Sequence, residues 1–175
     1  LHELCVEKGS ELPPGDAGRK YKGRVVFLGD RVKDQYWRVA VFEEMASSPA
    51  GLEASKFCDY FGMLSDEVTG ADYICEQSDA TQAYCQADLG GCDTWIRIPA
   101  NRQPEWWAGI ADPVCKLKKA LYGHPNAGSY WEKRCEDKVR ASGFIPVGTC
   151  AEWRSCFFHP TDRTILVIYV DDFKL

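Results

Sequence analysis

The sequence predicts an α+β fold in which antiparallel strands and helices surround one apolar core. Two apolar segments, 155–159 and 164–170, are separated only by Pro160-Thr161-Asp162-Arg163, a spacing typical of a β-hairpin. Over 129–141, by contrast, apolar residues recur every four positions, which indicates a helix. Helical and strand-like segments intermix along the chain without strict βαβ alternation, and this order favours α+β over a parallel α/β sheet.

The other elements are predicted from local patterns. The alternating, β-branched segment 21–28 predicts a strand that ends at Gly29-Asp30. An apolar stripe over 52–61 predicts a helix, with Ser47-Ser48-Pro49 as its expected start and Gly62 as its end. The remaining expected elements are a strand at 73–78 leading into Asp79, a turn and short helix at 80–89, and alternating strands at 95–98 and 114–121.

Length and composition predict one globular unit preceded by a short leader. The chain has 175 residues, 45% of them hydrophobic, which suffices for one core of ordinary size. Residues 1–18 are polar and contain Pro13-Pro14-Gly15, so a flexible leader is expected there. The sequence has neither a signal pattern nor an apolar run of about 18 residues, so we expect an intracellular protein, not secreted and without membrane partners.

The nine cysteines do not follow the spacing of a known thiol site. They include no CxxC pair and their total is odd, so neither a zinc site of the usual spacing nor a disulfide scaffold is indicated. Reduced thiols that pack as small apolar side chains are the expected state. A metal or redox role for some of them stays open.

Charge is distributed unevenly along the chain. The net charge of −5 opposes general affinity for nucleic acid. However, residues 19–38 carry a net +5 and residues 114–140 a net +4, whereas residues 40–112 between them carry −10. Two basic stretches flanking an acidic centre would suit a polyanion held beside a cation-binding site. Charges scattered over separate solvated faces are the alternative.

Carboxylates follow two of the predicted strands. Asp171-Asp172 come directly after the apolar run 165–170, where adjacent negative charges repel unless they are solvated or neutralised by a divalent cation. Asp79 ends another predicted strand, and Tyr84 stands five residues further on. Together these segments would supply the three acids that two-metal phosphoryl transfer requires. Each segment alone is also compatible with an ordinary acidic turn.

Six motifs occur in one fixed order. They are KGRVV at 22–26 with Gly29, Ser48-Pro49 with the helix at 52–61, DATQAYCQADL at 79–89, VCKLKKALYG at 114–123 followed by Trp131-Glu132, Gly143-Phe144 with SCFF at 155–158, and YVDD at 169–172. In type and order these motifs resemble the reverse transcriptase of copia-type (pseudovirus) LTR retrotransposons, from about Lys20 to Leu175.

The resemblance implies the fingers and palm of a right-hand polymerase fold over 19–175, with a mixed or antiparallel palm sheet and packed helices. The chain would end just after the catalytic hairpin, without the thumb and ribonuclease H regions. The implied activity is RNA- and DNA-directed DNA synthesis, in which a primer 3′-hydroxyl attacks a dNTP. The implied partners are template–primer, dNTPs, and the integrase and ribonuclease H of the Pol polyprotein, in cytoplasmic virus-like particles or the nucleus.

The resemblance also implies roles for single residues by position. Asp79 and Asp171 would hold two Mg²⁺ or Mn²⁺ ions, Asp172 would be a more peripheral acid, and the carbonyl of Ala80 would be a further ligand. The implied nucleotide-binding residues are Lys22 and Arg24 at the triphosphate, Tyr84 as the ring that blocks a 2′-hydroxyl, and Tyr122 with Gly123 beside base and template.

The chain departs from the family pattern after Gly123. There His124-Pro125-Asn126-Ala127-Gly128-Ser129 replaces the family's L-K-Q-A-P-R, which puts the template contact of this loop in doubt, and His124 is expected to be structural. A catalytically inactive remnant, or a fragment that binds nucleic acid without synthesis, is the main alternative. A different two-metal enzyme such as a nucleotide cyclase is a third, which the string VCKLKKALYG opposes.

Overall fold

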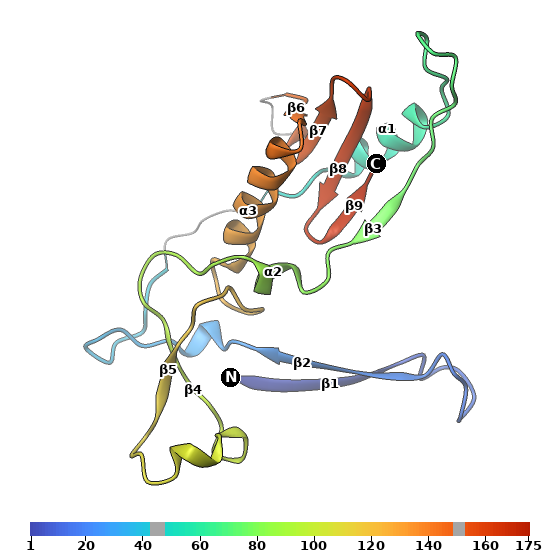
Figure 1. Ribbon diagram of the computed structural model, residues 1–175. Helices are drawn as coiled ribbons and strands as arrows, with labels where there is room; N and C mark the ends of the chain where they lie inside the picture. Colours follow the sequence, from blue (N-terminus) through green and yellow to red (C-terminus); the bar gives the residue numbers. More distant parts are fainter. Residues whose placement is uncertain (43–47, 149–152) are drawn as a thin grey trace.

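The computed structural model describes residues 1–42, 48–148 and 153–175. In this part of the chain, helices combine with three sheets in which every strand pair is antiparallel (Figure 1). The five-stranded sheet has the order β3-β9-β8-β7-β6, and two pairs, β1-β2 and β4-β5, stand apart from it. The strands are β1 (His2–Lys8), β2 (Lys20–Val26), β3 (Gln77–Asp79), β4 (Trp95–Arg97), β5 (Val114–Lys116), β6 (Ile145–Pro146), β7 (Cys156–His159), β8 (Thr164–Tyr169) and β9 (Asp172–Lys174).

Two helices cover opposite faces of the five-stranded sheet. Successive residues of a strand point to opposite faces, and β8 follows this rule. Leu166 and Ile168 are buried with residues of α3, whereas Val167 is buried with residues of α1 (Figure 1). The helices are α1 (Leu52–Phe61), α2 (Ala83–Gln86) and α3 (Ala127–Ala141), with 3₁₀ turns at Gly29–Arg31, Ala100–Arg102 and Glu105–Trp107.

Helix α3 and the β7-β8 hairpin confirm the two strongest local predictions. Trp131, Cys135 and Val139 lie one turn apart on α3 and are all buried. They pack against Phe157 of β7 and Leu166 of β8 in one core cluster. The apolar stripe read from the sequence is therefore the face that α3 turns to the sheet.

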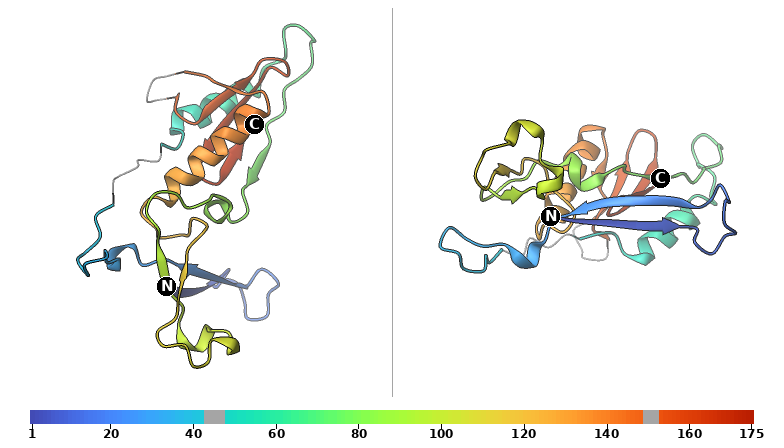
Figure 2. Two further views of the ribbon diagram at one scale, coloured as in Figure 1. Left: turned by 60° about the vertical axis from the view of Figure 1, so that its left-hand side comes forward. Right: turned by 90° about the horizontal axis from the view of Figure 1, so that it is seen from below.

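The N-terminal segment differs from the expected leader. Residues His2–Lys8 form β1, which pairs with Lys20–Val26 along its whole length. The turn between them is closed by a two-pronged ion pair, in which Arg19 donates to both carboxylate oxygens of Glu7 at 2.9 and 3.0 Å. A second such pair joins Arg102 to Glu3. The hairpin lies with β4-β5 at the end of the molecule away from α1 (Figure 2).

Three other boundaries also differ from the sequence prediction. Helix α1 begins after Gly51, and it ends at Gly62 as predicted; Ser47, part of its expected start, lies outside the described residues. The strand expected at 73–78 is confined to β3, because its partner β9 has only three residues. The strand expected at 114–121 pairs with β4 over Val114–Lys116, and further along only an isolated bridge joins Lys119 to Asp88.

A buried carboxylate fixes the loop between α1 and β3. One oxygen of Asp66 accepts hydrogen bonds from the backbone N–H groups of Val68 and Thr69 and from the Thr69 hydroxyl. The other accepts from the Tyr73 hydroxyl at 2.8 Å and from Arg163 at 2.5 Å. These bonds, the backbone bond from Thr69 first, hold the pKa of Asp66 well below its usual range. The loop is thereby tied to the β7-β8 turn, which contains Arg163.

We predict that Asp66→Asn lowers the stability of the fold in a pH-dependent manner. Because the folded-state pKa of Asp66 is lowered, its contribution is complete above the unfolded-state pKa, about 3.9, and is lost as the pH falls through the folded-state value. The difference in urea midpoint between the wild type and the variant should be constant above about pH 5 and shrink on acidification. Glu67→Gln, an exposed neighbour, is the control and should shift the midpoint little. A difference that does not depend on pH would contradict the role of the carboxylate.

Candidate functional site

The acids singled out in the sequence meet at one end of the five-stranded sheet. The β8-β9 hairpin turns at Val170 and Asp171, so that Tyr169 lies directly opposite Asp172. Strand β3 pairs with the other edge of β9 and places Asp79 opposite Asp172. Immediately beyond this pair, the N–H of Ala80 donates to the carbonyl oxygen of Asp171 at 2.7 Å. The backbones of Asp79, Asp171 and Asp172 are thus neighbours.

Two of the three side chains share one face of the sheet. Directly opposite residues of an antiparallel pair share a face, and Asp79 and Asp172 line one open hollow next to the start of α1, together with Ser55 and Lys174. Asp171 stands in the turn, where its negative charge raises the pKa of two other residues, Tyr84 and Tyr122. The two acids that share a face are therefore Asp79 and Asp172, whereas the resemblance pairs Asp79 with Asp171.

No side chain in the described part of the protein neutralises any of the three carboxylates. Within the described residues, neither Asp79 nor the Asp171-Asp172 doublet forms an ion pair with a basic group. Their oxygen atoms are hard ligands of the kind that Mg²⁺ and Mn²⁺ bind. However, the described part of the chain contains no group of three His, Cys, Asp or Glu side chains placed to hold a metal ion. The donor set suits a divalent cation, but only Asp79 and Asp172 line the same hollow.

Two tyrosines lie near Asp171, and an arginine lies over the ring of one of them. The rings of Tyr84 and Tyr122 are 4.7 Å apart, and the guanidinium carbon of Arg24 lies 5.8 Å from the centre of the Tyr122 ring. Burial, and then the negative charge of Asp171, raise the pKa of both phenols. Both phenols are therefore neutral near pH 7 and form one wall next to the carboxylates.

The end of β2 is docked against the loop that carries Tyr122. The N–H of Phe27 donates to the Tyr122 carbonyl oxygen at 2.7 Å. Gly123 has a φ of 87°, and a Cβ atom there would overlap the carbonyl oxygen of Phe27, so only glycine fits. Lys22 lies two positions before Arg24 on β2. It therefore shares a face of the strand with Arg24 but is further from Tyr122. The structure thus brings Arg24, Tyr84, Tyr122 and Gly123 together and leaves Lys22 at their margin.

His124 is packed in the manner of a structural residue. It is buried between the rings of Phe27 and Phe42, at centroid distances of 5.2 and 5.3 Å. Its Nδ1 accepts a hydrogen bond from the N–H of Asn126 at 3.2 Å, and among the described residues its Nε2 has no partner. Burial lowers the pKa of His124, which keeps the ring neutral.

The turn between β8 and β9 is held in an unfavourable backbone conformation. Val170 has a φ of 57°, a left-handed value that β-branched residues rarely adopt. Its carbonyl oxygen accepts a hydrogen bond from Nε1 of Trp131 at 2.6 Å. The sequence pattern placed Trp131 on the core face of α3. Its position along that face also brings its ring nitrogen to the turn.

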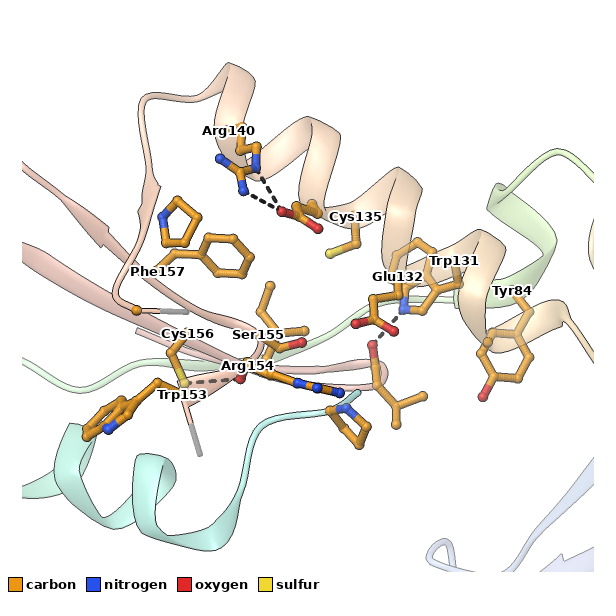
Figure 3. Close-up of a pocket in the computed structure, with 17 residues that line it drawn as sticks. Tyr84, Trp131, Glu132, Cys135, Arg140, Trp153, Arg154, Ser155, Cys156 and Phe157 are labelled. Atoms are coloured by element: carbon orange, nitrogen blue, oxygen red, sulfur yellow. Dashed lines mark hydrogen bonds and ion pairs between the residues drawn. The ribbon is translucent and has the colours of Figure 1, made fainter. Parts of the chain in front are cut away.

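Behind this turn lies a cavity of about 280 Å³ between α3 and the sheet. Figure 3 shows Trp131 and Tyr84 at one end of the cavity and Phe157 with Cys156 at the other. The side chain of Glu132 and the thiol of Cys135 point into it from α3. Because Val170 also lines the cavity, the back of the turn is not filled by close packing.

Comparison of the chain with models of known protein families, with curated proteins and with solved structures gave no match. Among the described residues, no helix is both long enough and apolar enough to cross a lipid bilayer.

We predict that Val170→Gly is more stable than Val170→Ala, by about 1 kcal/mol. Both variants lose the same methyl groups, but only glycine removes the Cβ atom that opposes a left-handed backbone, a cost of about 1–2 kcal/mol. The greater freedom of glycine in the unfolded chain offsets about 0.4–1 kcal/mol of this gain. Urea unfolding measures the difference. The same two substitutions at Tyr169, in the strand, serve as the control and should show the opposite order.

Proposed function

We propose that this chain is a nucleotidyl-transfer module of the reverse-transcriptase type, which extends a DNA primer on an RNA or DNA template with Mg²⁺ or Mn²⁺. The observation that carries the proposal is that the backbones of Asp79, Asp171 and Asp172 meet at one end of the sheet, near the Tyr122 ring over which Arg24 lies. Acids from separate strands that converge next to a cation and an aromatic ring suit a phosphate-bearing nucleotide.

The carboxylates would bind the metal ions and orient the reacting groups. Divalent ions supply charge neutralisation for the attacking and leaving oxygens of an in-line displacement. Asp79 and Asp172 would bind from the hollow beside α1, and Asp171 would bind from the turn between them and the tyrosines. Because these acids have no basic partners among the described residues, bound cations would also relieve the repulsion within the doublet.

The neighbouring wall would hold the nucleotide. The guanidinium of Arg24 can donate several hydrogen bonds to phosphate oxygens, and Lys22 on the same face would add a second positive charge further out. The ring of Tyr84, packed on Tyr122, would stand beside the sugar and exclude a 2′-hydroxyl by its bulk. The backbone at Gly123 would allow close approach of a base or template nucleotide.

An inactive, retrotransposon-derived remnant is the second candidate. One observation favours it: within the described residues, the three acids do not form one compact group of ligands. A remnant would keep the fold and the tyrosine wall but would not bring Asp171 to the side shared by Asp79 and Asp172. Metal binding separates the two candidates.

We predict a weak Mn²⁺ site that requires all three acids. In Asp79→Asn, Asp171→Asn and Asp172→Asn, removal of one charged oxygen ligand should weaken Mn²⁺ binding by about tenfold or more, the equivalent of about 1.4 kcal/mol. Electron paramagnetic resonance of free Mn²⁺ measures the titration. Asp16→Asn, an exposed acid near the N-terminus, is the matched control. If the three variants titrate like the wild type, the site assignment fails.

We predict that Tyr84 sets the preference for deoxynucleotides. In a single-nucleotide incorporation assay on an RNA or DNA template, Tyr84→Ala should raise the ratio of rNTP to dNTP incorporation by about tenfold or more, since the steric block is removed. Tyr84→Phe keeps the ring and should retain the wild-type ratio. An unchanged ratio in Tyr84→Ala would exclude this role, and no incorporation by the wild type would favour the remnant.

A further inference from the structure

Two thiols from distant parts of the chain lie together on the α1 side of the sheet. Cys58 is buried in the last turns of α1, and Cys75 is exposed two residues before β3. The sequence spacing gave no sign of this pair, because the two residues belong to no recognised motif.

Their proximity rests on several contacts. Besides burial, the neighbouring Cys75 thiol raises the pKa of Cys58, so the two side chains are close to each other. A Cβ atom added to Gly62 would lie 3.5 Å both from Cβ of Cys75 and from the carbonyl oxygen of Cys58. The Cys75 sulfur lies 3.9 Å from a carboxylate oxygen of Asp59, the residue after Cys58. These distances are ordinary van der Waals contacts, and they place the segment around Cys75 against the end of α1.

The two sulfurs differ in their access to solvent. Cys75 is exposed, whereas Cys58 is buried, with its sulfur 3.9 Å from the Ile165 carbonyl oxygen and 4.0 Å from that of Lys174. Burial raises the pKa of Cys58 to about 11, so this thiol is protonated at neutral pH. Cys75 is therefore the thiol that a dissolved oxidant meets first, and Cys58 is placed to react second.

We propose that Cys58 and Cys75 are a redox-active pair that forms a reversible disulfide on reaction with hydrogen peroxide or an organic hydroperoxide. The Cys75 sulfur attacks a peroxide oxygen, the O–O bond breaks, and water or alcohol leaves, which gives a sulfenic acid at Cys75. The Cys58 sulfur then attacks the Cys75 sulfur, the S–O bond breaks, and water leaves with the Cys58 proton. Two thiols are oxidised by one peroxide, and a small thiol reverses the bond by exchange.

The bond would connect α1 to the strand that carries Asp79. Cys75 is four residues before Asp79, and α1 already contacts β9 through Lys174, which donates to Ser55 and pairs with Asp59. Oxidation would therefore fix one wall of the hollow that Asp79 and Asp172 share. This consequence for metal binding rests on the proposed function, whereas the disulfide itself does not.

Peptide mapping after peroxide treatment tests the pair. The protein is treated with hydrogen peroxide, its remaining thiols are blocked with N-ethylmaleimide, and it is digested with the protease that cuts before aspartate. Trypsin is unsuitable, because Phe57–Arg97 contains both cysteines and no internal Lys or Arg. Cleavage before aspartate gives Asp34–Cys58 and Asp72–Ser78, each with one cysteine. We expect these two fragments joined, and separate again after treatment with dithiothreitol.

Matched variants show whether the link is specific. Cys75→Ser, at an exposed position, should abolish the joined fragments and leave the Cys58 fragment alkylated after unfolding. Cys92→Ser, also exposed, should leave the link at the wild-type level. If the two fragments stay separate in the wild type, or if Cys75 is found joined to other cysteines instead, the proposal is overturned.

The effect on metal binding is measured on the same samples. Oxidised wild-type protein should bind Mn²⁺ with an affinity at least about threefold different from that of the reduced protein, and Cys75→Ser should show no such difference. Equal affinities would overturn the regulatory consequence while the mapped disulfide stands. Absence of Mn²⁺ binding in both forms would instead count against the proposed function, so that the two failures are distinguishable.

Discussion

The backbone hydrogen bonding of β9 is the constraint on which the arrangement of the site depends. This strand has only three residues, yet it pairs with β8 on one edge and with β3 on the other. Mutual bonds between Glu76 and Leu175 and the bond from Ala80 to Asp171 extend the β3 side at both ends. A shift of one residue in this register would send Asp172 to the opposite face. The register therefore decides which acids share a face.

Packing on both sides makes that register definite. Phe173 packs with the α3 cluster, while Lys174 on the other face is largely buried against α1, where it pairs with Asp59. Trp131 fixes the neighbouring turn through the Val170 carbonyl oxygen. A buried tryptophan of this kind contributes about 3–5 kcal/mol when compared with alanine, which exceeds the cost of one left-handed residue. The strained turn persists because the free energy gained by burying Trp131 is larger than the free-energy cost of the left-handed backbone at Val170.

The sequence predicts those parts of the fold in which local pattern and tertiary role agree. The apolar stripe of α3 and the two apolar strands β7 and β8 have strong periods, and they were found within two residues of their predicted limits. The start of α1 was misplaced because Ser48 does not cap the helix and instead bonds to residues of other elements. Its N–H donates to Glu132, its carbonyl accepts from Ser155, and its hydroxyl accepts from Arg154. Strand β1 was missed because its polar sequence does not indicate a strand. It becomes one through pairing with β2. The left-handed φ angle of Val170, in the turn that carries Asp171, was not revealed by any residue pattern.

The exposed β1-β2 hairpin gives the molecule two parts with different responses to ionic strength. A two-stranded ribbon with both faces in solvent has little apolar burial to stabilise it. The ion pair of Glu7 with Arg19 closes its turn, and that of Glu3 with Arg102 joins it to the turn at Ala100–Arg102; dissolved salt screens both pairs over a Debye length of about 8 Å near 0.15 M. The sheet between α1 and α3 is held mainly by buried apolar side chains, so such screening affects it less. Raised salt would thus weaken the ion pairs of the arm that carries Arg24 more than the packing of the strands that carry the acids.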